Sequence, residues 1–384
     1  MNNLTMGGAE NSLVSLLQVI DYNAFDVDLL LFKKEGFFLN SVPSQVTLLG
    51  PVEEFSYFDM PIRKAIFKAL LRFRWDIIYA RIAFLFLKSE KNSAVKEQKS
   101  WKYLSVCIPK LKGNYDVAIG FLEKTPNYYC VDKTNAQKKI GFIRTDYKTM
   151  GMDETIDLKY FDQLDYIFCN SEKTEETLIQ IFPQFSFKIK TIQNFFSVQT
   201  IHDLSNQSVA LPEAELSVVS MGRLVSLKGF DLAIEACKII KEKGIPIKWI
   251  LIGDGPERMM LQNLVDTYNL GDSFFILGEK ENPFPYVKWA DFYVHTSKYE
   301  GKSRAVEEAK ILHKIIISTR YPSILEQIEN GVTGFVVDFS AEALAEKIVE
   351  IQNNATLQHK IIANLQNEKI DNEKELQKLT AYIH

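Results

Sequence analysis

Hydrophobic and polar residues alternate in blocks along the second half of the chain. Short, continuous apolar runs rich in β-branched and aromatic residues are separated by segments with a helical period, such as residues 231–244, which end in glycine. The runs predicted to be strands are residues 215–221, 247–253, 273–278, 291–297 and 314–318. Apolar strands that alternate with helices predict a parallel sheet covered on both faces.

The first half shows the same pattern less regularly. A helix is expected over residues 9–20, and another over 171–182, where a serine precedes an acidic first turn. The predicted strands are residues 26–32, 46–50, 115–120, 138–143, 165–171 and 188–194. The expected fold is therefore α/β, with two doubly wound, Rossmann-like domains that face each other across a cleft.

The length of 384 residues also favours two domains. Residues 197–214 are polar, rich in turn-forming residues and without a period, so we interpret them as the linker. An N-terminal domain is then expected over residues 1–196, a C-terminal domain over 215–354, and a charged helical tail over 355–384.

Composition and charge narrow the classes of function. A net charge of −4 argues against nucleic acid as a partner. The four cysteines and five histidines show no metal-ligand spacing, so we expect no metal, no cofactor and a reducing, cytoplasmic location. The first ten residues lack the features of a secretory signal, and no apolar run has the length of a membrane span.

Two segments of the second half carry the clearest chemistry. In the first, a predicted strand end is followed by Arg223 and Lys228 and then by a helix. A strand-to-helix turn offers backbone N–H groups to an anion, and two cations there would clamp a diphosphate. The alternative is that both are solvated surface charges.

In the second segment, residues 295–312, a loop after a strand contains Glu300, and the following helix contains Glu308. A carboxylate is unfavourable beside a phosphate, so we expect it to accept hydrogen bonds from sugar and ribose hydroxyls. Taken alone, Glu307 and Glu308 would be ordinary exposed charges of a helix.

These segments resemble family-four retaining glycosyltransferases of the GT-B fold, the glycosyl transferases group 1, of the bacterial surface-polysaccharide type. The family's G-R-L-x-x-x-K-G is similar to residues 222–229, its I-G-x-G-P-E to residues 252–257, and its E-x7-E to Glu300 and Glu308. Three motifs in the family's order and at its usual separations are far more specific than one alone.

The resemblance implies a role for each position. Arg223 and Lys228 would hold the donor diphosphate, which becomes the leaving group, and with Glu300 they are the expected catalytic residues. Glu308 would bind the ribose, and Glu300 would hold the transferred sugar and the phosphate together with the backbone of residues 301–303. The other expected donor-binding residues are Gly7, Gly8, Gly222, Gly253, Glu279, Asn282, Gly301, Lys302 and Ser303.

Some of these positions depart from the family pattern. After Glu300 the family often reads G-F-P, whereas this chain has Gly301, Lys302 and Ser303 followed by Arg304, and Lys302 or Arg304 would add charge near the phosphates. Residues 278–283 resemble the loop that borders the nucleobase.

The first half resembles the family more thinly. Residues 6–10 resemble the family's glycine loop, but only five residues precede it where relatives have a strand. Either the chain begins too late, or it is truncated, or this domain does without the strand.

Residues 141–147 resemble a stretch that reads I-H-x-D-Y in relatives, with Arg144 in place of the histidine. An arginine cannot accept a proton, so Arg144 would bind an anionic acceptor or stabilise the donor, with Asp146 as a second candidate on the acceptor side. The alternative is a surface arginine in an imperfect alignment.

Residues 61–113 contain thirteen lysines and arginines but only three acidic residues, with aromatic residues between them. Residues 62–88 have helical character, and basic apolar helices of this kind lie on anionic membranes. We favour membrane contact over the alternative, a long helix buried on one side with basic side chains snorkelling outside.

We therefore predict retaining transfer of a hexose-type sugar from a UDP- or GDP-sugar to a saccharide or lipid-linked saccharide in surface polysaccharide biosynthesis, without metal. The location would be cytoplasmic, peripheral on the inner face of the plasma membrane. The alternatives are a GT-B epimerase or phosphorylase acting on a sugar phosphate or sugar nucleotide, and a non-catalytic partner subunit of a glycosyltransferase.

Overall fold

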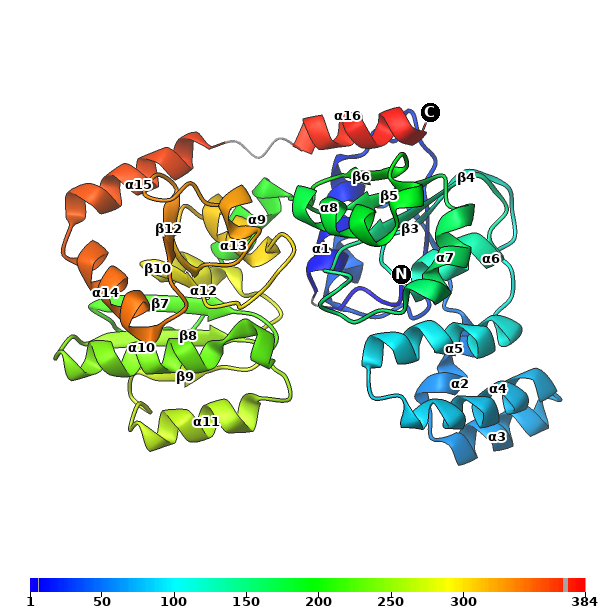
Figure 1. Cartoon of the computed structure of the whole chain (residues 1–384), viewed down its shortest axis with the longest axis horizontal. Helices are drawn as coiled ribbons and strands as arrows, with labels where there is room; N and C mark the ends of the chain where they lie inside the picture. The colour runs from blue at the N-terminus through cyan, green and yellow to red at the C-terminus, as the bar shows by residue number, and fades with distance from the viewer. Residues whose placement is uncertain (6, 369–371, 384) are drawn as a thin grey trace. The chain divides into compact units, whose positions relative to one another are not determined.

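The computed structural model describes residues 1–5, 7–368 and 372–383, without the side chain of Lys88 (Figure 1). Met6 of the predicted glycine loop and four residues of the predicted tail lie outside this description. The chain divides into two compact units: unit 1 is Met1–Phe196 with Asp371–His384, and unit 2 is Ser197–Ile370.

Unit 2 is built on one parallel sheet in the order β12-β11-β10-β7-β8-β9. Its strands are β7 (Leu216–Met221), β8 (Ile247–Ile252), β9 (Phe274–Ile276), β10 (Phe292–His295), β11 (Ile315–Thr319) and β12 (Gly334–Val337). The five strands predicted for this half are confirmed. The sequence reading missed β12, in which three apolar residues follow Gly334 and precede Asp338.

Helices cover the sheet of unit 2 on both faces, as its apolar strands require. The helices and 3-10 turns are α9 (Val198–Ser205), η4 (Ser226–Lys228), α10 (Phe230–Glu242), α11 (Arg258–Thr267), α12 (Phe284–Trp289), α13 (Arg304–Ile311), η5 (Ile324–Glu326), α14 (Ala341–Gln352) and α15 (Ala355–Asn367). Helices α10, α11 and α14 gather on one face, and α9, α12 and α13 on the other. Val218, Trp249 and Phe292 are fully buried in the sheet between these layers.

The unit boundaries differ from the expected ones at two places. The segment interpreted as a linker contains α9, which packs against α12 within unit 2. The predicted tail divides: α15 belongs to unit 2, whereas α16 (Asn372–Ile383) belongs to unit 1, where the Glu375 carboxylate accepts a hydrogen bond from the backbone of Gln193 at 2.9 Å. Helices of this length bury too few side chains for their packing partners to be read from the sequence.

Unit 1 has its strands in two groups. A four-stranded parallel sheet has the order β3-β4-β5-β6, and β1 pairs with β2 in parallel. The strands are β1 (Asp28–Leu30), β2 (Thr47–Leu49), β3 (Tyr115–Gly120), β4 (Ala136–Ile143), β5 (Tyr166–Cys169) and β6 (Ile189–Thr191), so all six predicted strands are confirmed. The helices and 3-10 turns are α1 (Gly8–Val19), η1 (Phe37–Ser41), α2 (Glu53–Asp59), α3 (Ile62–Leu71), α4 (Trp75–Leu85), η2 (Phe86–Ser89), α5 (Ser93–Cys107), α6 (Thr125–Lys133), α7 (Glu154–Gln163), α8 (Glu172–Ile181) and η3 (Pro183–Phe185).

Residues 1–4 lie along the chain that leaves β1. The carbonyl of Met1 accepts from the Phe32 amide at 3.0 Å, and the Leu4 amide donates to the carbonyl of Glu35 at 2.9 Å. Leu4 is fully buried in the same core as strand residues of both groups. None of the described residues before Gly7 belongs to a strand, so residues 1–5 do not form the strand that the family resemblance implies before the glycine loop.

Residues 62–88 form α3 and α4 rather than one long helix. Phe73 between them has a left-handed backbone with φ 54°, and Arg74 forms ion pairs with Asp76 at 2.6 Å and Glu54 at 3.0 Å. The sequence shows no glycine or proline here, so the break was not predicted. Both helices bury one side, with Ala65, Ala69 and Ile77 in the interior, as the snorkelling alternative expects, but large apolar side chains of the same hairpin also face solvent.

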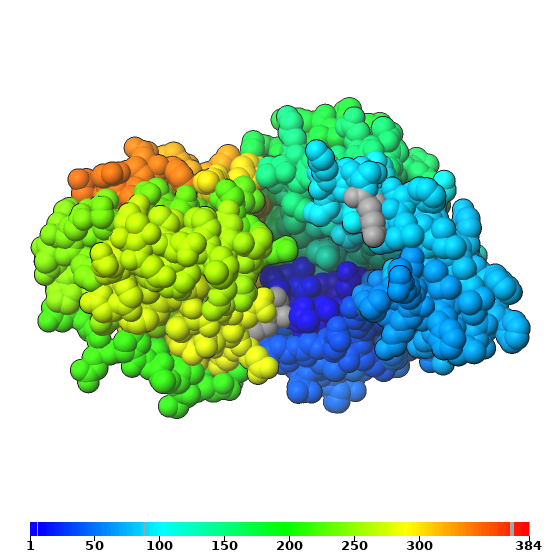
Figure 2. All heavy atoms as spheres, turned by 90° about the horizontal axis from the view of Figure 1, so that it is seen from below, coloured from blue at the N-terminus to red at the C-terminus, as the bar shows by residue number. Residues whose placement is uncertain are grey.

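We call these side chains the α3–α4 surface. They are Phe67, Leu70, Leu71, Phe73, Trp75, Tyr79, Ile82, Leu85 and Phe86, each between 38% and 80% exposed. In the space-filling view the segment, in light blue, lies at the outer edge of unit 1 (Figure 2). Exposed apolar patches that are contiguous and large mark interaction sites in soluble proteins.

Candidate functional site

Two predicted motifs of unit 2 follow neighbouring strands of its sheet. β7 and β10 are parallel and adjacent, with Phe292 opposite Val218. From β7 the chain proceeds to β8 and β9 on one side and returns to β10 on the other side. In doubly wound folds, ligands bind at the carboxyl ends of the strands where the strand order reverses in this way. The loops that contain Arg223 and Glu300 both leave the sheet at this point.

The loop after β7 carries the two predicted cations. Gly229 ends η4 with φ +61°, and a Cβ there would lie 2.4 Å from the carbonyl oxygen of Thr296, so glycine is required. Next to it, the carbonyl of Lys228 accepts a hydrogen bond from the Thr296 hydroxyl at 2.8 Å. Arg223 is exposed, and within the described ranges its guanidinium makes no ion pair.

A second glycine brings the loops after β7 and β8 into contact. Gly253 has φ +144°, and a Cβ on it would lie 1.9 Å from the carbonyl oxygen of Gly222. The amide of Gly222 donates to the carbonyl of Ile252 at 3.0 Å. Gly253 is thus needed for the close approach of the two backbones. Direct contact of Gly222 and Gly253 with a donor stays a prediction.

The Glu300 carboxylate connects the ends of β7 and β10. Its Oε1 accepts hydrogen bonds from the Lys228 ammonium and from the hydroxyl of Ser297, the latter at 2.8 Å. The Nε2 atom of His295 lies 3.0 Å from the same oxygen. Residues 72 positions apart in the sequence therefore form one charged cluster.

The charge state of Glu300 follows from these neighbours. Burial by itself raises the pKa of the carboxyl group, but the Lys228 ammonium and His295 overcome this effect and hold the pKa well below its usual range. Glu300 is therefore ionised at neutral pH, so it accepts hydrogen bonds and does not donate a proton.

Helix α13 carries the second predicted carboxylate. Glu308 is 7% exposed, and its Oε1 accepts a hydrogen bond from Nε of Arg304 at 2.8 Å. Glu307 is equally buried, with Nζ of Lys302 at 3.8 Å from its Oε1. The alternative that these glutamates are ordinary exposed charges is wrong. The two cations expected near the phosphates lie beside the carboxylates of α13.

Two polar residues after β11 hold the loop that contains Glu300, and the sequence reading missed them. The hydroxyl of Ser323 donates to the carbonyls of Glu300, at 2.8 Å, and Gly301. The Gln327 side chain accepts from the Ser303 amide at 2.8 Å and donates to the Ser303 carbonyl at 2.7 Å. The Ser303 amide, expected to bind phosphate, is therefore engaged by Gln327. The only available signal for these residues was their position shortly after a predicted strand.

The loop predicted to border the nucleobase contains one exposed and one engaged residue. Glu279 is exposed. The Asn282 side chain accepts from the amide of Phe284 at 3.1 Å and donates to the carbonyl of Leu204 at 2.7 Å, so it connects the start of α12 to the end of α9. Donor contact by these two residues stays a prediction.

The predicted glycine loop belongs to unit 1. Gly7 precedes α1, whose first residue is Gly8, and the carbonyl of Gly7 accepts from the amide of Asn11 at 3.0 Å. These glycines therefore stand at a helix start, as expected, and their part in donor binding stays a prediction.

Arg144 is buried in unit 1 directly after β4. Its guanidinium lies 4.0 Å from the ring centre of Phe121 and 4.9 Å from that of Phe142. It donates to Oδ1 of Asn194 at 2.6 Å and to the hydroxyl of Ser12 at 3.2 Å. The alternative of a surface arginine is wrong. Arg144 connects β4 to α1 and to the segment after β6.

Carboxylates surround the same turn. Asp146 is buried, and its Oδ1 accepts from the amide of Thr149 at 2.5 Å. Glu123, which the sequence reading missed, accepts from the amide of Arg144 and from the hydroxyl of Thr145, both at 3.1 Å. Together these contacts hold the turn in one conformation.

Groups of three or more histidine, cysteine or carboxylate side chains able to hold a metal are not found in the described ranges. The four cysteines are buried and unpaired, and burial raises the pKa of Cys130 to about 11 and that of Cys237 to about 12. None of the helices that the structure describes is both long and apolar enough to traverse a bilayer.

Sequence comparison finds a family match for the part of the chain that carries the three motifs. Residues 202–368 match the family model "Glycosyl transferases group 1". This segment belongs to the glycosyl transferases group 1. It is also similar to the glycosyltransferase MJ1059 of Methanocaldococcus jannaschii, with 29% identity over 167 residues, which covers 42% of this chain and 41% of that protein.

A longer match includes unit 1. The poly(ribitol-phosphate) alpha-N-acetylglucosaminyltransferase of Staphylococcus aureus is 23% identical over 338 residues, which covers 80% of this chain and 65% of that protein. The chain thus spans less than two thirds of the length of these curated relatives.

Solved structures identify the fold. The Anabaena protein HepE, in complex with UDP and glucose, superposes with a TM-score of 0.66 at 16% identity, over 99% of this chain and 97% of HepE. The fold is GT-B, as predicted, with two Rossmann-like domains.

Proposed function

We propose that the protein transfers a sugar from a nucleotide-sugar donor with retention of configuration. The observation that carries this proposal is the Lys228–Glu300 pair at the reversal of strand order in unit 2. An ionised carboxylate next to a lysine and near an arginine suits a ligand that has both hydroxyl groups and phosphates. The family assignment of this segment supports the same class of ligand.

In the proposed reaction, the bond between the anomeric carbon and the phosphate oxygen breaks, and the acceptor oxygen bonds to that carbon on the same face. The acceptor's proton passes to the departing phosphate oxygen. Arg223 and Lys228 stabilise the charge that grows on the diphosphate, which is the electrostatic effect that usually dominates catalysis. The Lys228 ammonium has three donors, so it binds Glu300 and a phosphate together. No metal is required.

The donor is a UDP- or GDP-sugar in this proposal, with Glu308 on the ribose and Glu300 on the transferred sugar. The acceptor in this proposal is a saccharide or a lipid-linked saccharide of a surface polysaccharide, and the Staphylococcus relative is named for transfer to a polymer, poly(ribitol-phosphate). An incubation of the purified protein with a panel of nucleotide sugars, followed by mass spectrometry, tests the donor class. Retained activity after chelation of divalent cations would support the metal-free scheme.

We also propose that unit 1 contacts an anionic membrane from the cytoplasmic side. Its α3–α4 surface exposes five aromatic side chains, and exposed Arg63, Lys64 and Arg72 lie on the same hairpin. Aromatic burial combined with attraction of basic residues to anionic headgroups is how peripheral proteins bind such surfaces. A lipid-linked acceptor would make this contact useful.

A non-catalytic partner subunit is the second candidate, because Arg144 stands in unit 1 where relatives have a histidine. Donor hydrolysis by the protein alone separates the two. Turnover without a partner supports the transferase, whereas turnover only after a second protein is added supports the subunit.

A further inference from the structure

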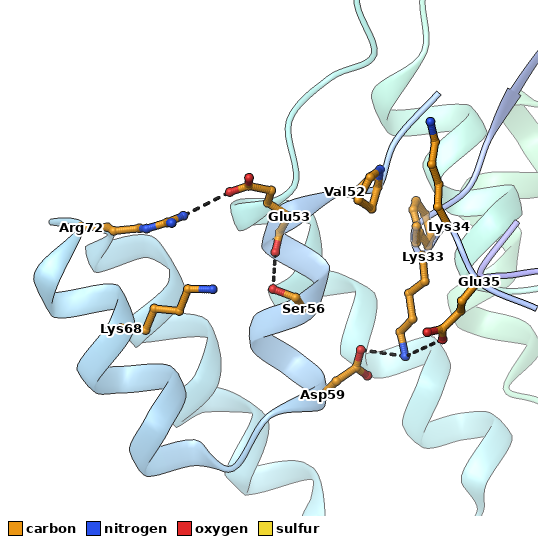
Figure 3. Close-up of a pocket in the computed structure, with 11 residues that line it drawn as sticks. Lys33, Lys34, Glu35, Val52, Glu53, Ser56, Asp59, Lys68 and Arg72 are labelled. Atoms are coloured by element: carbon orange, nitrogen blue, oxygen red, sulfur yellow. Dashed lines mark hydrogen bonds and ion pairs between the residues drawn. The ribbon is translucent and has the colours of Figure 1, made fainter. Parts of the chain in front are cut away.

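A cavity of about 640 Å³ lies in unit 1 where the chain leaves β1 and β2 (Figure 3). The chain after β1 contributes Phe32, Lys33 and Lys34, and the end of α3 contributes Lys68 and its C-cap residue Arg72 from the opposite side. The carboxyl ends of parallel strands are where doubly wound domains bind ligands. All of the lining residues belong to unit 1, so this cavity is distinct from the charged cluster of unit 2.

The lining of the cavity has one more cation than it has carboxylates. Four lysine and arginine side chains face three carboxylates, those of Glu35, Glu53 and Asp59. Lys33 is 2.7 Å from Asp59, and Arg72 is 3.1 Å from Glu53. Both pairs are solvent-exposed, and such pairs are weak, so a phosphate with more charge would displace the carboxylates.

Lys68 is the cation with the least competition. Its ammonium lies 5.0 Å from the ring centre of Tyr57. Within the ranges that the structure describes, Lys68 has no carboxylate partner. In Figure 3 its side chain extends from α3 toward α2, between Arg72 and Asp59. An anion in the cavity would therefore meet Lys68 without first breaking an ion pair.

The helix that supplies these cations also carries the α3–α4 surface. Lys68 is in the last turn of α3 and Arg72 is the C-cap residue directly after it, and both side chains line the cavity. Phe67 and Leu71 are each one position earlier and form the neighbouring stripe, with exposed fractions of 64% and 67%. The two cations and the membrane-directed apolar stripe are thus adjacent at the end of α3.

We infer that the cavity binds the phosphate group of a lipid-linked acceptor while the α3–α4 surface holds its lipid in the bilayer. This inference rests on the proposed function, since it specifies the acceptor of that reaction. The phosphate of a lipid in the bilayer would bind the cations while the adjacent apolar stripe contacts the membrane. A soluble phosphate would bind the cations without any contact to the apolar stripe. Glu53 and Asp59 keep Arg72 and Lys33 in place until the phosphate arrives.

The test is sedimentation of the protein with neutral phosphatidylcholine vesicles that contain farnesyl diphosphate, in the presence of UDP to occupy the donor site. The variant Lys68→Gln/Arg72→Gln removes two cations of the cavity. Arg63→Gln/Lys64→Gln is its matched control, because it removes two charges from the same helix outside the lining. Vesicles that contain phosphatidylglycerol instead report attraction to anionic headgroups, and thermal unfolding reports whether each variant folds.

We expect farnesyl diphosphate to increase the affinity of the unaltered protein for the vesicles. Lys68→Gln/Arg72→Gln should lower the affinity for vesicles with farnesyl diphosphate by about tenfold or more. The affinity of the control variant for these vesicles should stay within about threefold of that of the unaltered protein. On vesicles with phosphatidylglycerol, both variants should lose affinity to the same extent. Lys68→Arg should retain binding. The inference would be overturned if the two variants lost equal affinity for vesicles with farnesyl diphosphate. It would also be overturned if the protein bound soluble glycerol phosphate as tightly as farnesyl diphosphate. Donor hydrolysis is measured in parallel: its absence refutes the transferase, whereas its persistence without diphosphate binding refutes the cavity alone.

Discussion

Lys228 and Glu300 form an ion pair between the loops that follow β7 and β10. The two strands are adjacent in the sheet but lie on opposite sides of the reversal in strand order. The pair is shielded from solvent on both sides, with side-chain exposed fractions of 21% and 15%. It defines the position at which we place the donor diphosphate.

The first prediction separates catalysis from stability at this position. Arg223 is exposed and without an ion pair in the described part of the chain, so Arg223→Ala should leave thermal unfolding unchanged. It should lower the rate of donor hydrolysis about 100-fold to 1000-fold, as the loss of one transition-state contact does. Arg320→Ala, which removes another exposed cation of unit 2, is the control. Full activity of the Arg223 variant would refute the proposed role.

The second prediction concerns pH. Because the pKa of Glu300 is lower in the folded protein than its usual value of 4.5, the pair stabilises the fold above pH 4.5. That stabilisation should be lost progressively as the pH falls below 4.5. Glu300→Gln should be less stable than the unaltered protein at pH 7 by about 2–3 kcal/mol, with a smaller difference in acid. Urea unfolding across this pH range measures it, and a difference that is independent of pH would contradict the assignment.

The third prediction tests the close approach of the loops after β7 and β8. In Gly253→Ala, the new Cβ would lie 1.9 Å from the carbonyl of Gly222, so a loop must move. We expect a loss of about 2–4 kcal/mol in the free energy of unfolding, together with weaker binding of the donor. Gly271→Ala is the matched control, because nothing lies within 4 Å of a Cβ there. Equal stability of the two variants would show that this contact is not required.

The fourth prediction assigns Arg144 to the folding of unit 1. Arg144→Ala would leave the acceptor oxygen of Asn194 and the faces of two aromatic rings without their partner. The free energy of unfolding should fall by about 2–4 kcal/mol. Arg144→Lys keeps the charge but not the planar fork, and it should recover only part of that loss. Donor binding, measured by titration with UDP, should persist in both variants, and unchanged unfolding would contradict the structural role.

The fifth prediction concerns the α3–α4 surface. Phe67→Ser/Leu71→Ser/Phe73→Ser should lower affinity for anionic vesicles by more than about tenfold, because it removes the apolar part of the contact. Met259→Ser/Leu325→Ser, which alters exposed apolar residues of unit 2, is the control. Binding should also weaken as salt is raised, since basic residues contribute. Unchanged sedimentation of the triple variant would exclude this surface.

The sequence predicted eleven strands correctly, most clearly in unit 2, where β7, β10 and β11 are continuous apolar runs that the parallel sheet buries on both faces. It also placed the Arg223, Lys228 and Glu300 positions at strand ends. It did not predict β12 or the break at Phe73. β12 offers only three apolar residues in a row, Phe335 to Val337, and no glycine or proline marks the break.

By itself, then, the sequence determined the two doubly wound units and the family of the donor segment, because periodicity and motif spacing are local properties. Only the tertiary structure decided which side chains meet. It paired Lys228 with Glu300, engaged the Ser303 amide with Gln327, buried Arg144 against two aromatic rings, and brought Lys68 and Arg72 to a cavity with Lys33. These contacts join residues far apart in the sequence, so only the packing of helices on the sheets fixes them.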